Sequence, residues 1–434
     1  MENNKAFVCK IGNFKSIEGA DRIIQASVIL DNIPITQVVV GKDDYNENDL
    51  VVYFDSNLCI EQAVIEAIDK QHENYNKENF VSISRYLAKG NRVKTVKLRN
   101  TISDGLVIPV EKFESFLDKK TKSSFNEGFS FNDLGDVHIC HKYVPPVKQQ
   151  STPGSKKDRK KRKLIHIEDG FFPEHEDTLQ LARNIENINL EDIIHISRKY
   201  HGTSSRTGYI LVDRASLKNK ILKFLKIKNN EYNYVYGSRR VVKEIETIKI
   251  KEKQHFYSSD IWTKVGKETF KGKLHKGEII FYEIVGFLPD GNPIQKICGN
   301  AYDYGAPPKS CKVLVYRITL TNEDGYTVEY SIEQIKERCK QMSVDFVEEY
   351  YHGKAKNLFN INIDDHWHNN FLESLKVEFL EKDAIDCLNK TTADEGIVIR
   401  KNTFNFEAFK LKSNRFLERE SKDLEDLSSE KIEE

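Results

Sequence analysis

Apolar and polar positions alternate along the first third of the chain in short runs separated by turn-forming residues. Strand-length apolar stretches occur in KAFVCKIGNF, RIIQASVILDNIPITQVVVG, DLVVYFDSNLCI and NRVKTVKLRNTISDGLVIPV. The pair DN at 31–32 and the triplet SDG at 103–105 each interrupt one of these stretches, and such residues favour tight turns. The segment EQAVIEAIDKQ has apolar residues at helical spacing instead. Several short strands with turns between them predict a small β-barrel or sandwich.

Strands and helices mix from Leu164 onward. Strand patterns occur in DIIHISRKY, YILVD, EIIFYEIVGF, CKVLVYRITLT, EGIVIRK and EAFKLKS. The segments EDTLQLARNIEN and SIEQIKERCKQM have the apolar spacing of amphipathic helices. The second of them carries Ser331 and Gln334 at the spacing of a capping box. This part of the chain is therefore predicted to form an α+β domain.

A change of composition separates the two parts. The segment PPVKQQSTPGSKKDRKKRK is rich in proline, serine and lysine and has no core-forming pattern. We predict a β-rich module at 1–144, a basic flexible linker at 145–163, an α+β domain at 164–414 and a charged carboxy-terminal tail at 415–434. The linker's charge could also bind a phosphate backbone, but a solvated linker is the favoured interpretation.

Composition indicates the cellular compartment of the protein but not its binding partners. The chain has 67 basic and 67 acidic residues, so net charge indicates no partner. No apolar run has the length of a membrane span, and MENNKAFVCK lacks the features of a secretion signal. The 7 cysteines are irregularly spaced without a C-x-x-C, which argues against a disulfide scaffold or a cysteine-rich zinc site. We expect a cytoplasmic monomer with reduced thiols and no membrane contact.

Ionisable residues project from apolar strands at several positions of the second domain. Lys199 ends one strand, Glu283 lies inside IIFYEIVGF, and Glu395 immediately precedes another strand. Lys410 and Lys412 are two apart in FKLK, so they point to the same face of a strand. Two cations on one buried face are costly unless an anion meets them. Taken alone, each lysine is better explained as a solvated residue and each glutamate as an ion-pair partner; together they indicate a phosphate site.

The same set suits attack by a lysine on a phosphate. A free lysine amine has a pKa near ~10.4, and neighbouring cations favour its neutral, nucleophilic form. Two carboxylates could hold magnesium through its water shell, because magnesium dehydrates reluctantly. The lysines would also stabilise the charge on a pyrophosphate leaving group.

These residues lie in motifs that resemble those of the covalent nucleotidyltransferases, which include polynucleotide ligases and mRNA capping enzymes. The resemblance covers about Phe171 to Lys412 and consists of KYHGTS, GSRR, FYEIVG, VYRIT, DEGIVIRK and FKLK in that order. A histidine at position 201, and a tail too short for a carboxy-terminal OB domain, favour the RNA ligases among them. The first module resembles, more weakly, the amino-terminal OB module of the Deinococcus-type nick-sealing RNA ligases.

The resemblance implies an α+β fold. It consists of a nucleotidyltransferase (ligase adenylation) domain of antiparallel sheets and helices, preceded by a small β-barrel OB-like module. It also implies that Lys199 accepts AMP and that Lys410 and Lys412 bind the α-phosphate. Glu395 would bind a metal-bound water, and His201 would serve the steps after adenylation or position phosphate.

Further roles follow from the same resemblance. Arg239 would contact phosphate or ribose, and Glu283 would hold the ribose or a metal-bound water. Tyr316 would stack on adenine, although an aromatic residue on a strand is often simply part of a core. His175 and Asp177 could also bind the nucleotide, but Asp177 would equally suit a helix start.

Three positions depart from the family pattern. Arg198 stands where many relatives have a glutamate that reads adenine, and Arg317 follows the stacking aromatic where an aspartate is common. Ser204 stands where several RNA ligases have asparagine. We count Ser204 among the residues that contact nucleic acid at its 5′-phosphate end.

Four cations lie in one strand-like run of the first module, namely Arg92, Lys94, Lys97 and Arg99. They could follow a phosphate backbone, as OB surfaces do, or form an ordinary solvated strand face. The histidines in DDHWHNN are better explained by a polar loop than by a metal site.

The sequence thus predicts an ATP-dependent RNA ligase that requires magnesium or manganese. Lys199 would form a lysine–AMP, AMP would pass to a 5′-phosphate, and an RNA 3′-hydroxyl would seal the break. The expected partners are nicked or broken RNA strands, with an RNA/DNA hybrid duplex possible. The alternatives are a DNA nick ligase, an mRNA capping guanylyltransferase, or a non-catalytic nucleic-acid-binding protein with a decayed ligase domain.

Overall fold

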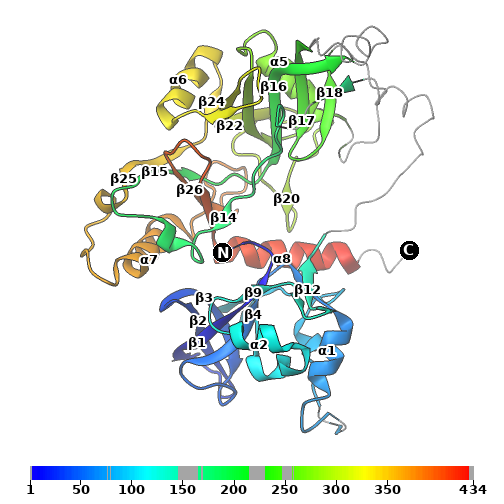
Figure 1. The fold of residues 1–434 in the computed structure, drawn as a ribbon, viewed down its shortest axis with the longest axis vertical. Helices are drawn as coiled ribbons and strands as arrows, with labels where there is room; N and C mark the ends of the chain where they lie inside the picture. Colours follow the sequence, from blue (N-terminus) through cyan, green and yellow to red (C-terminus); the bar gives the residue numbers. More distant parts are fainter. Residues whose placement is uncertain are drawn as a thin grey trace, which may run out of the picture.

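The amino-terminal strands form one antiparallel sheet, drawn in blue at the bottom of Figure 1. The computed structural model describes residues 2–75, 77–78, 80–144, 165–167, 170–214, 230–246, 257 and 259–429. The sheet has the order β3-β2-β1-β4-β8, and β9 also pairs with β1. Its strands are β1 (Ala6–Ser16), β2 (Ile23–Leu30), β3 (Ile33–Gly41), β4 (Asp49–Phe54), β8 (Leu106–Pro109) and β9 (Ser130–Phe131).

Short elements surround this sheet and complete the amino-terminal module. The strand pairs are β5 (Leu58–Ile60) with β12 (Cys140–Lys142), β6 (Thr95–Leu98) with β7 (Thr101–Asp104), and β10 (Asp133–Leu134) with β11 (Val137–His138). The helices are α1 (Gln62–Asp69) and α2 (Lys119–Ser124), with 3-10 turns at Ile83–Tyr86 and Val110–Phe116. The DN turn has positive φ at both residues, 49° and 63°, as its sequence predicts.

Two further sheets form the second domain. The 8-stranded sheet has the order β18-β17-β16-β19-β22-β23, with β13 and β24 at its margins. The 5-stranded sheet has the order β14-β27-β26-β15-β25. Their strands are β13 (Ile165–His166), β14 (Leu179–Gln180), β15 (Ile193–Arg198), β16 (Thr203–Arg214), β17 (Asn230–Ser238), β18 (Val242–Ile245), β19 (Glu278–Gly286), β22 (Cys311–Thr321), β23 (Thr327–Glu329), β24 (Asp345–Phe346), β25 (Glu349–Lys354), β26 (Gly396–Lys401) and β27 (Ala408–Lys412).

Helices cover these sheets, and a small hairpin extends from them. The helices are α5 (Ile261–Phe270), α6 (Ile332–Met342), α7 (Trp367–Phe379) and α8 (Asn414–Ser429), and the hairpin pairs β20 (Lys296–Ile297) with β21 (Asn300–Ala301). Short 3-10 turns occur at Ile185–Asn187 and Ala355–Asn357. The capping box of α6 forms as predicted, with Gln334 N–H donating to the Ser331 hydroxyl. No sequence pattern indicated α5, and α7 begins within the DDHWHNN segment that we expected to be a loop.

The segment EDTLQLARNIEN is not the helix that its spacing predicts. Leu179–Gln180 instead pairs with β27 as the parallel strand β14. The chain then turns so that Arg183 reaches the amino-terminal module. Its guanidinium pairs with Asp55 at 2.6 Å and lies over the rings of Phe7 and Tyr53 at 5.0 and 5.7 Å. Tertiary contacts of the arginine and the strand pairing therefore override local helical periodicity.

Helix α8 lies between the two domains, drawn in red in Figure 1. On the amino-terminal side, Arg92 donates to the carbonyl oxygen of Ser421 at 3.1 Å, and Lys94 pairs with Glu425 at 2.7 Å. A buried apolar cluster also spans both domains, joining Phe7 of β1 to Phe409 of β27. Residues 415–429 of the predicted charged tail thus form a helix that packs at the domain interface.

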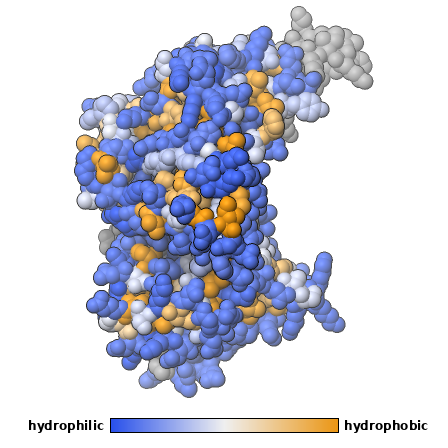
Figure 2. Space-filling view, turned by 90° about the vertical axis from the view of Figure 1, so that its left-hand side faces the viewer, coloured by the Kyte–Doolittle hydropathy of each residue, from blue (hydrophilic) through white to orange (hydrophobic). Residues whose placement is uncertain are grey.

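The remaining predictions on organisation concern the linker and the surface. The basic linker, 145–163, falls outside the described residues. Among the helices that the structure describes, none combines the length and the apolar character that crossing a bilayer requires. The face drawn in Figure 2 is mostly hydrophilic, with hydrophobic residues in small patches.

Candidate active site

The two sheets of the second domain enclose a cavity of about 560 Å³, a volume ordinary for a small-molecule site. Lys199 lies in the connection that leaves β15 of the 5-stranded sheet and enters β16 of the 8-stranded sheet. Its backbone N–H donates to the carbonyl oxygen of Gly396 at 2.8 Å, which fixes the connection against β26. The residues predicted to be catalytic or to bind the nucleotide line this cavity, namely Lys199, His201, Arg239, Glu283, Tyr316, Glu395, Lys410 and Lys412. Ser204, the residue expected to contact nucleic acid, also lines it, as does His175, whereas Asp177 does not.

Two glycines allow the strands around Lys199 to approach closely. A Cβ atom at Gly202 would lie 2.5 Å from the carbonyl oxygen of Ile284 on β19. Gly396 has a φ of 131°, and a Cβ there would lie 2.1 Å from the carbonyl oxygen of Leu411 on β27. Because both obstacles are backbone atoms, a larger residue at either position would displace a strand that carries a cavity residue.

Glu395 pairs with two lysines. Its Oε1 atom lies 3.0 Å from Lys199 Nζ and 3.3 Å from Lys412 Nζ. Burial alone would raise the pKa of Glu395, but the two ammonium groups outweigh burial and lower this pKa to about 2. The Oε2 atom is buried without a hydrogen-bond partner among the described residues, and His201 Nδ1 lies 3.9 Å from it.

Glu283 faces the same cavity from β19 but in a different electrostatic environment. It lies opposite Ser204 of β16 in the sheet. Burial raises the pKa of Glu283 to about 8, despite the opposing effect of the Lys199 charge. The two carboxyl groups are therefore not equivalent, since Glu395 is ionised at neutral pH and Glu283 holds its proton.

The two lysines of β27 also differ. Lys412 pairs with Glu420 of α8 at 3.2 Å in addition to Glu395, and although burial opposes its charge, these two carboxylates raise its pKa. Burial lowers the pKa of Lys410 to about 8, with further lowering from the charges of Lys412 and Lys199. An anion that entered the cavity would relieve this repulsion.

The other end of the cavity contains aromatic and hydroxyl groups. The Tyr316 hydroxyl lies 2.9 Å from Ser204 Oγ and 3.1 Å from His175 Nδ1. Burial lowers the pKa of His175 to about 3, so its imidazole is neutral. Arg239 pairs with Asp177, which sets the guanidinium at the cavity wall. Asp177 thus anchors an arginine, and it starts no helix.

His201 is held by aromatic rings rather than by polar partners. The imidazole centroid lies 4.9 Å from the ring of Tyr302 and 5.1 Å from the ring of Phe416 on α8. Its backbone N–H donates to the hydroxyl of Tyr304 at 2.8 Å. Burial lowers the pKa of His201, which favours a neutral imidazole beside Lys199.

Two of the positions that depart from the family pattern form buried ion pairs. Arg198 donates to Asp394 at 3.1 Å and to both oxygens of Asp386 at 2.9 Å. Arg198 immediately precedes Lys199, and Asp394 immediately precedes Glu395. Their bond therefore holds the Lys199–Glu395 ion pair in register. Arg317 donates to Glu329 and to Glu176, with its guanidinium over the Phe406 ring at 4.1 Å.

The four cations predicted on the surface of the amino-terminal module do not form one exposed row. Arg92 is 1% exposed and Lys94 pairs with Glu425, so both face α8. Lys97 and Arg99 are exposed at the β6–β7 turn. Burial of Arg92 removes it from any surface that could follow a phosphate backbone.

Several cavity features escaped the sequence analysis. Glu420 reaches Lys412 from a helix that reads as an acidic tail, and Phe406, Gln295 and Trp262 line the cavity from loops and from α5. None of these residues lies in a motif, so no local signal could have found them.

Comparisons with known proteins concern the fold that carries this site. A family model described as an OB-fold domain matches residues 5–110. An alanine mutant of Naegleria gruberi RNA ligase with ATP and Mn superposes with a TM-score of 0.56 at 16% identity, covering 98% of this chain and 100% of that one. A second, apo mutant gives 0.57 at 16% identity over 96% and 98%, and the ligase with PPi gives 0.56 at 16% over 95% and 97%. No curated protein matches the sequence.

These matches establish the class of fold. The chain has an amino-terminal OB-fold module followed by an α+β domain of antiparallel sheets, and this arrangement is that of the Naegleria RNA ligase over the length of both chains. The predicted fold class and the predicted resemblance to RNA ligases are confirmed at the level of fold.

Proposed function

We propose that this protein is an ATP-dependent RNA ligase that forms a covalent lysine–AMP on Lys199. The observation that carries the proposal is the cluster of charged side chains in the cavity. Glu395 lies 3.0 Å from the Lys199 amine and 3.3 Å from the Lys412 amine, and Lys410 lines the same cavity. The ligase-like fold supports the same function. A lysine amine at the junction of two sheets, facing further cations, suits attack on a nucleoside triphosphate.

In the first step, the neutral Lys199 amine attacks the α-phosphorus of ATP after its proton has passed to solvent. A nitrogen–phosphorus bond forms as the bond to the pyrophosphate oxygen breaks, and the nitrogen releases its second proton to solvent. Lys410 and Lys412 share one face of β27, where their charges stabilise the phosphate oxygens and the departing pyrophosphate. Tyr316 and the neutral His175 offer an aromatic and hydrogen-bonding surface for adenine.

The cavity fits a hydrated divalent cation. Glu395 Oε2 is buried without a partner among the described residues, and burial raises the pKa of Glu283 to about 8 although the charges of Lys199 and Arg239 oppose the rise. Oxygen donors of this kind suit magnesium or manganese. Glu283 and Glu395 would hold the cation, which would neutralise charge on the triphosphate.

In the later steps, AMP passes to the 5′-phosphate of an RNA or DNA strand, and an RNA 3′-hydroxyl then displaces AMP to form the phosphodiester. Each is an in-line displacement for which positioning is the main requirement. His201, neutral and in contact with α8, positions the phosphate in these steps. The exposed pair Lys97 and Arg99 offers the amino-terminal module a place to touch the strand.

The test is the intact mass of the protein after incubation with manganese and either ATP or GTP. We expect a gain of one AMP with ATP, loss of the gain in Lys199→Ala, and retention in Lys340→Ala, because Lys340 is exposed on α6 away from the cavity. Sealing assays on nicked duplexes with ribose or deoxyribose at the 3′ end then show whether the strand that supplies the 3′-hydroxyl must be RNA.

Each other outcome contradicts the proposal in a specific way. A gain with GTP alone would indicate capping chemistry, and sealing of deoxyribose 3′ ends alone would indicate a DNA ligase. If a protein shown to carry no AMP beforehand gains no mass with either nucleotide, the result would indicate a non-catalytic nucleic-acid-binding protein.

A further inference from the structure

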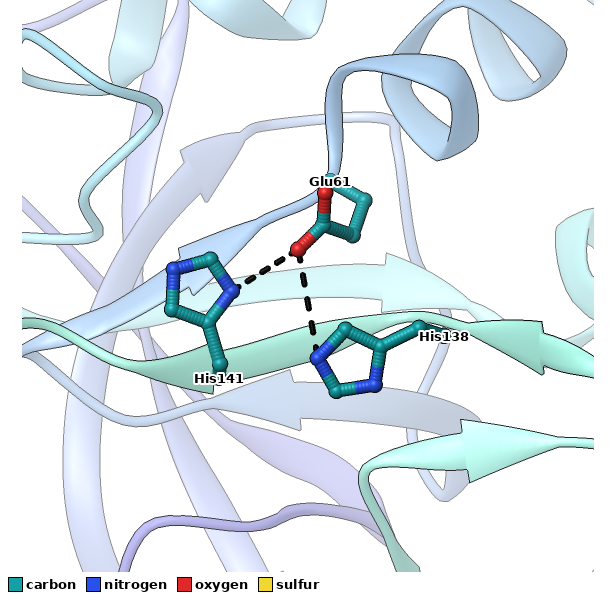
Figure 3. A group of neighbouring side chains, drawn as sticks. All are labelled: Glu61, His138 and His141. Carbon is teal, nitrogen blue, oxygen red and sulfur yellow. Dashed lines mark hydrogen bonds and ion pairs between the residues drawn. The ribbon is translucent and has the colours of Figure 1, made fainter.

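A carboxylate and two imidazoles of the amino-terminal module point toward one another, remote from the cavity just described. Glu61 Oε1 lies 2.8 Å from His141 Nδ1 and 3.9 Å from His138 Nε2, and all three ligand atoms lie within 4.8 Å of one another. Figure 3 shows the three side chains converging, Glu61 from the start of α1, His138 from β11 and His141 from β12.

The backbone fixes the segments that carry these side chains. The N–H of Glu61 donates at 3.0 Å to the carbonyl oxygen of Ile139, which lies between the two histidines in the sequence. One residue further on, β12 pairs with β5, placing His141 opposite Cys59. Backbone pairing therefore holds the segment that carries the two histidines beside the segment that carries Glu61, and the side chains span the remaining distance.

Asp133 provides a second observation that points to a metal. Its Oδ1 atom lies 2.6 Å from His138 Nδ1. A carboxylate in this position holds the proton on Nδ1, so the lone pair of Nε2 faces Glu61 and is available to a metal. A carboxylate behind a histidine is the usual second partner of a metal-bound imidazole.

The donor set selects the metal. Two imidazole nitrogens and one carboxylate suit zinc, whereas magnesium and calcium require mainly oxygen ligands. Zinc bonds of about 2.0–2.2 Å in a tetrahedron separate the ligand atoms by roughly 3.3–3.6 Å. The separations of Glu61 Oε1 from the two histidine nitrogens, 2.8 and 3.9 Å, lie on either side of this range, and the two nitrogens lie within 4.8 Å of each other. Rotation of the side chains would bring all three atoms to these separations. His138 and His141 are about half exposed, which leaves a fourth position to water.

We propose that Glu61, His138 and His141 form a zinc site that ties the β10–β12 segment to the β5–α1 corner of the OB module. The cavity between the two sheets contributes no residue to this site, so the proposal is independent of the ligase activity. Zinc would cross-link residues that are about 80 apart in sequence, as the His141–Glu61 contact already does, and would stabilise the folded module.

The test is calorimetric titration of metal-free, full-length protein with zinc chloride. We expect one tightly bound zinc, lost in Glu61→Gln and in His141→Gln. Asp133→Asn should weaken binding by about 10–100-fold, the usual effect of removing the carboxylate behind a ligating histidine. His72→Gln is the matched control, because His72 is exposed in the same module but outside the cluster.

Two further measurements keep the result interpretable. Cobalt in place of zinc should give the intense visible absorption of a tetrahedral site, absent in His141→Gln. Zinc should raise the Tm by several degrees in the parent protein and in His72→Gln but leave His141→Gln unchanged. Circular dichroism of each metal-free variant confirms that it is folded.

The proposal is overturned if zinc binds equally well to Glu61→Gln and His141→Gln, both folded. Loss of binding in Cys298→Ser alone would likewise overturn it, because the exposed thiol of Cys298 would then be the ligand.

Discussion

The two walls of the cavity differ in how completely their charges are matched. On the β26–β27 wall, Glu395 meets Lys199 and Lys412, and Glu420 meets Lys412 as well. On the β19 wall, Glu283 forms no ion pair with any residue that the structure describes, and burial raises its pKa to about 8.

This difference indicates which groups belong to the protein's own framework and which await a ligand. Buried charges persist when they are paired, and an unpaired buried carboxyl keeps its proton instead. The β26–β27 wall is assembled before any nucleotide binds, so it orients Lys199. Under the proposed function, a bound cation would ionise Glu283 and so complete the charge of the β19 wall.

The largest expected effect comes from Glu395→Gln. The change leaves Lys199 and Lys412 without their shared carboxylate, so we expect AMP transfer to fall on the order of 10²-fold. The free energy of unfolding should fall on the order of 3 kcal/mol, because one partner of a buried pair is removed. Single-turnover rates with ATP and denaturant unfolding measure the two effects.

Glu283→Gln is the matched comparison for this first prediction. Because Glu283 is already protonated at neutral pH, the amide replaces a neutral group and should not lower stability. Equal destabilisation by the two variants would contradict the distinction between the walls.

The second prediction concerns the pH dependence of Glu283→Gln. Between pH 4.5 and about 8, the folded protein keeps a proton on Glu283 that the unfolded chain has released, so stability falls as pH rises. Glutamine cannot ionise, so the Tm of the variant minus that of the parent protein should increase by a few degrees across this window. Titrating groups that do not interact with Glu283 cancel in the difference, which thermal unfolding at a series of pH values measures.

Manganese sharpens the same measurement. A bound cation favours the ionised carboxylate, so the Tm difference should shrink when manganese is present. A difference that is constant with pH would show that Glu283 carries its charge already in the free protein, and the two walls would then be alike.

The strand-borne residues of the site follow from the sequence, because their chemistry is local. Lys410 and Lys412 share a face through strand periodicity, and the close-packed glycine after Lys199 belongs to its motif. To predict that these residues share one cavity, it was enough to assume that their strands pack together. The antiparallel pairing and the α+β fold follow in the same way from alternating patterns.

Residues whose roles depend on distant parts of the chain did not follow from the sequence. Arg183 sits in a helix-like pattern, but its contacts with Asp55 and Tyr53 belong to the other domain. Arg92 lies in an alternating pattern typical of surface cations, yet α8 covers it. In each case a contact across more than a hundred residues decides the structure, and no window of local sequence contains it.

The smallest expected effect tests how far the paired wall extends into α8. Glu420 competes with any phosphate for Lys412, since their charged groups lie 3.2 Å apart. Glu420→Gln should therefore lower the KM for ATP in the AMP-transfer reaction by up to about fivefold, the equivalent of a partly exposed ion pair, while kcat stays the same. Glu418→Gln is the control, because Glu418 pairs with Lys422 on the same helix. A KM that rises in Glu420→Gln would show instead that Glu420 positions Lys412 for the nucleotide, and α8 would then belong to the framework that orients the lysines.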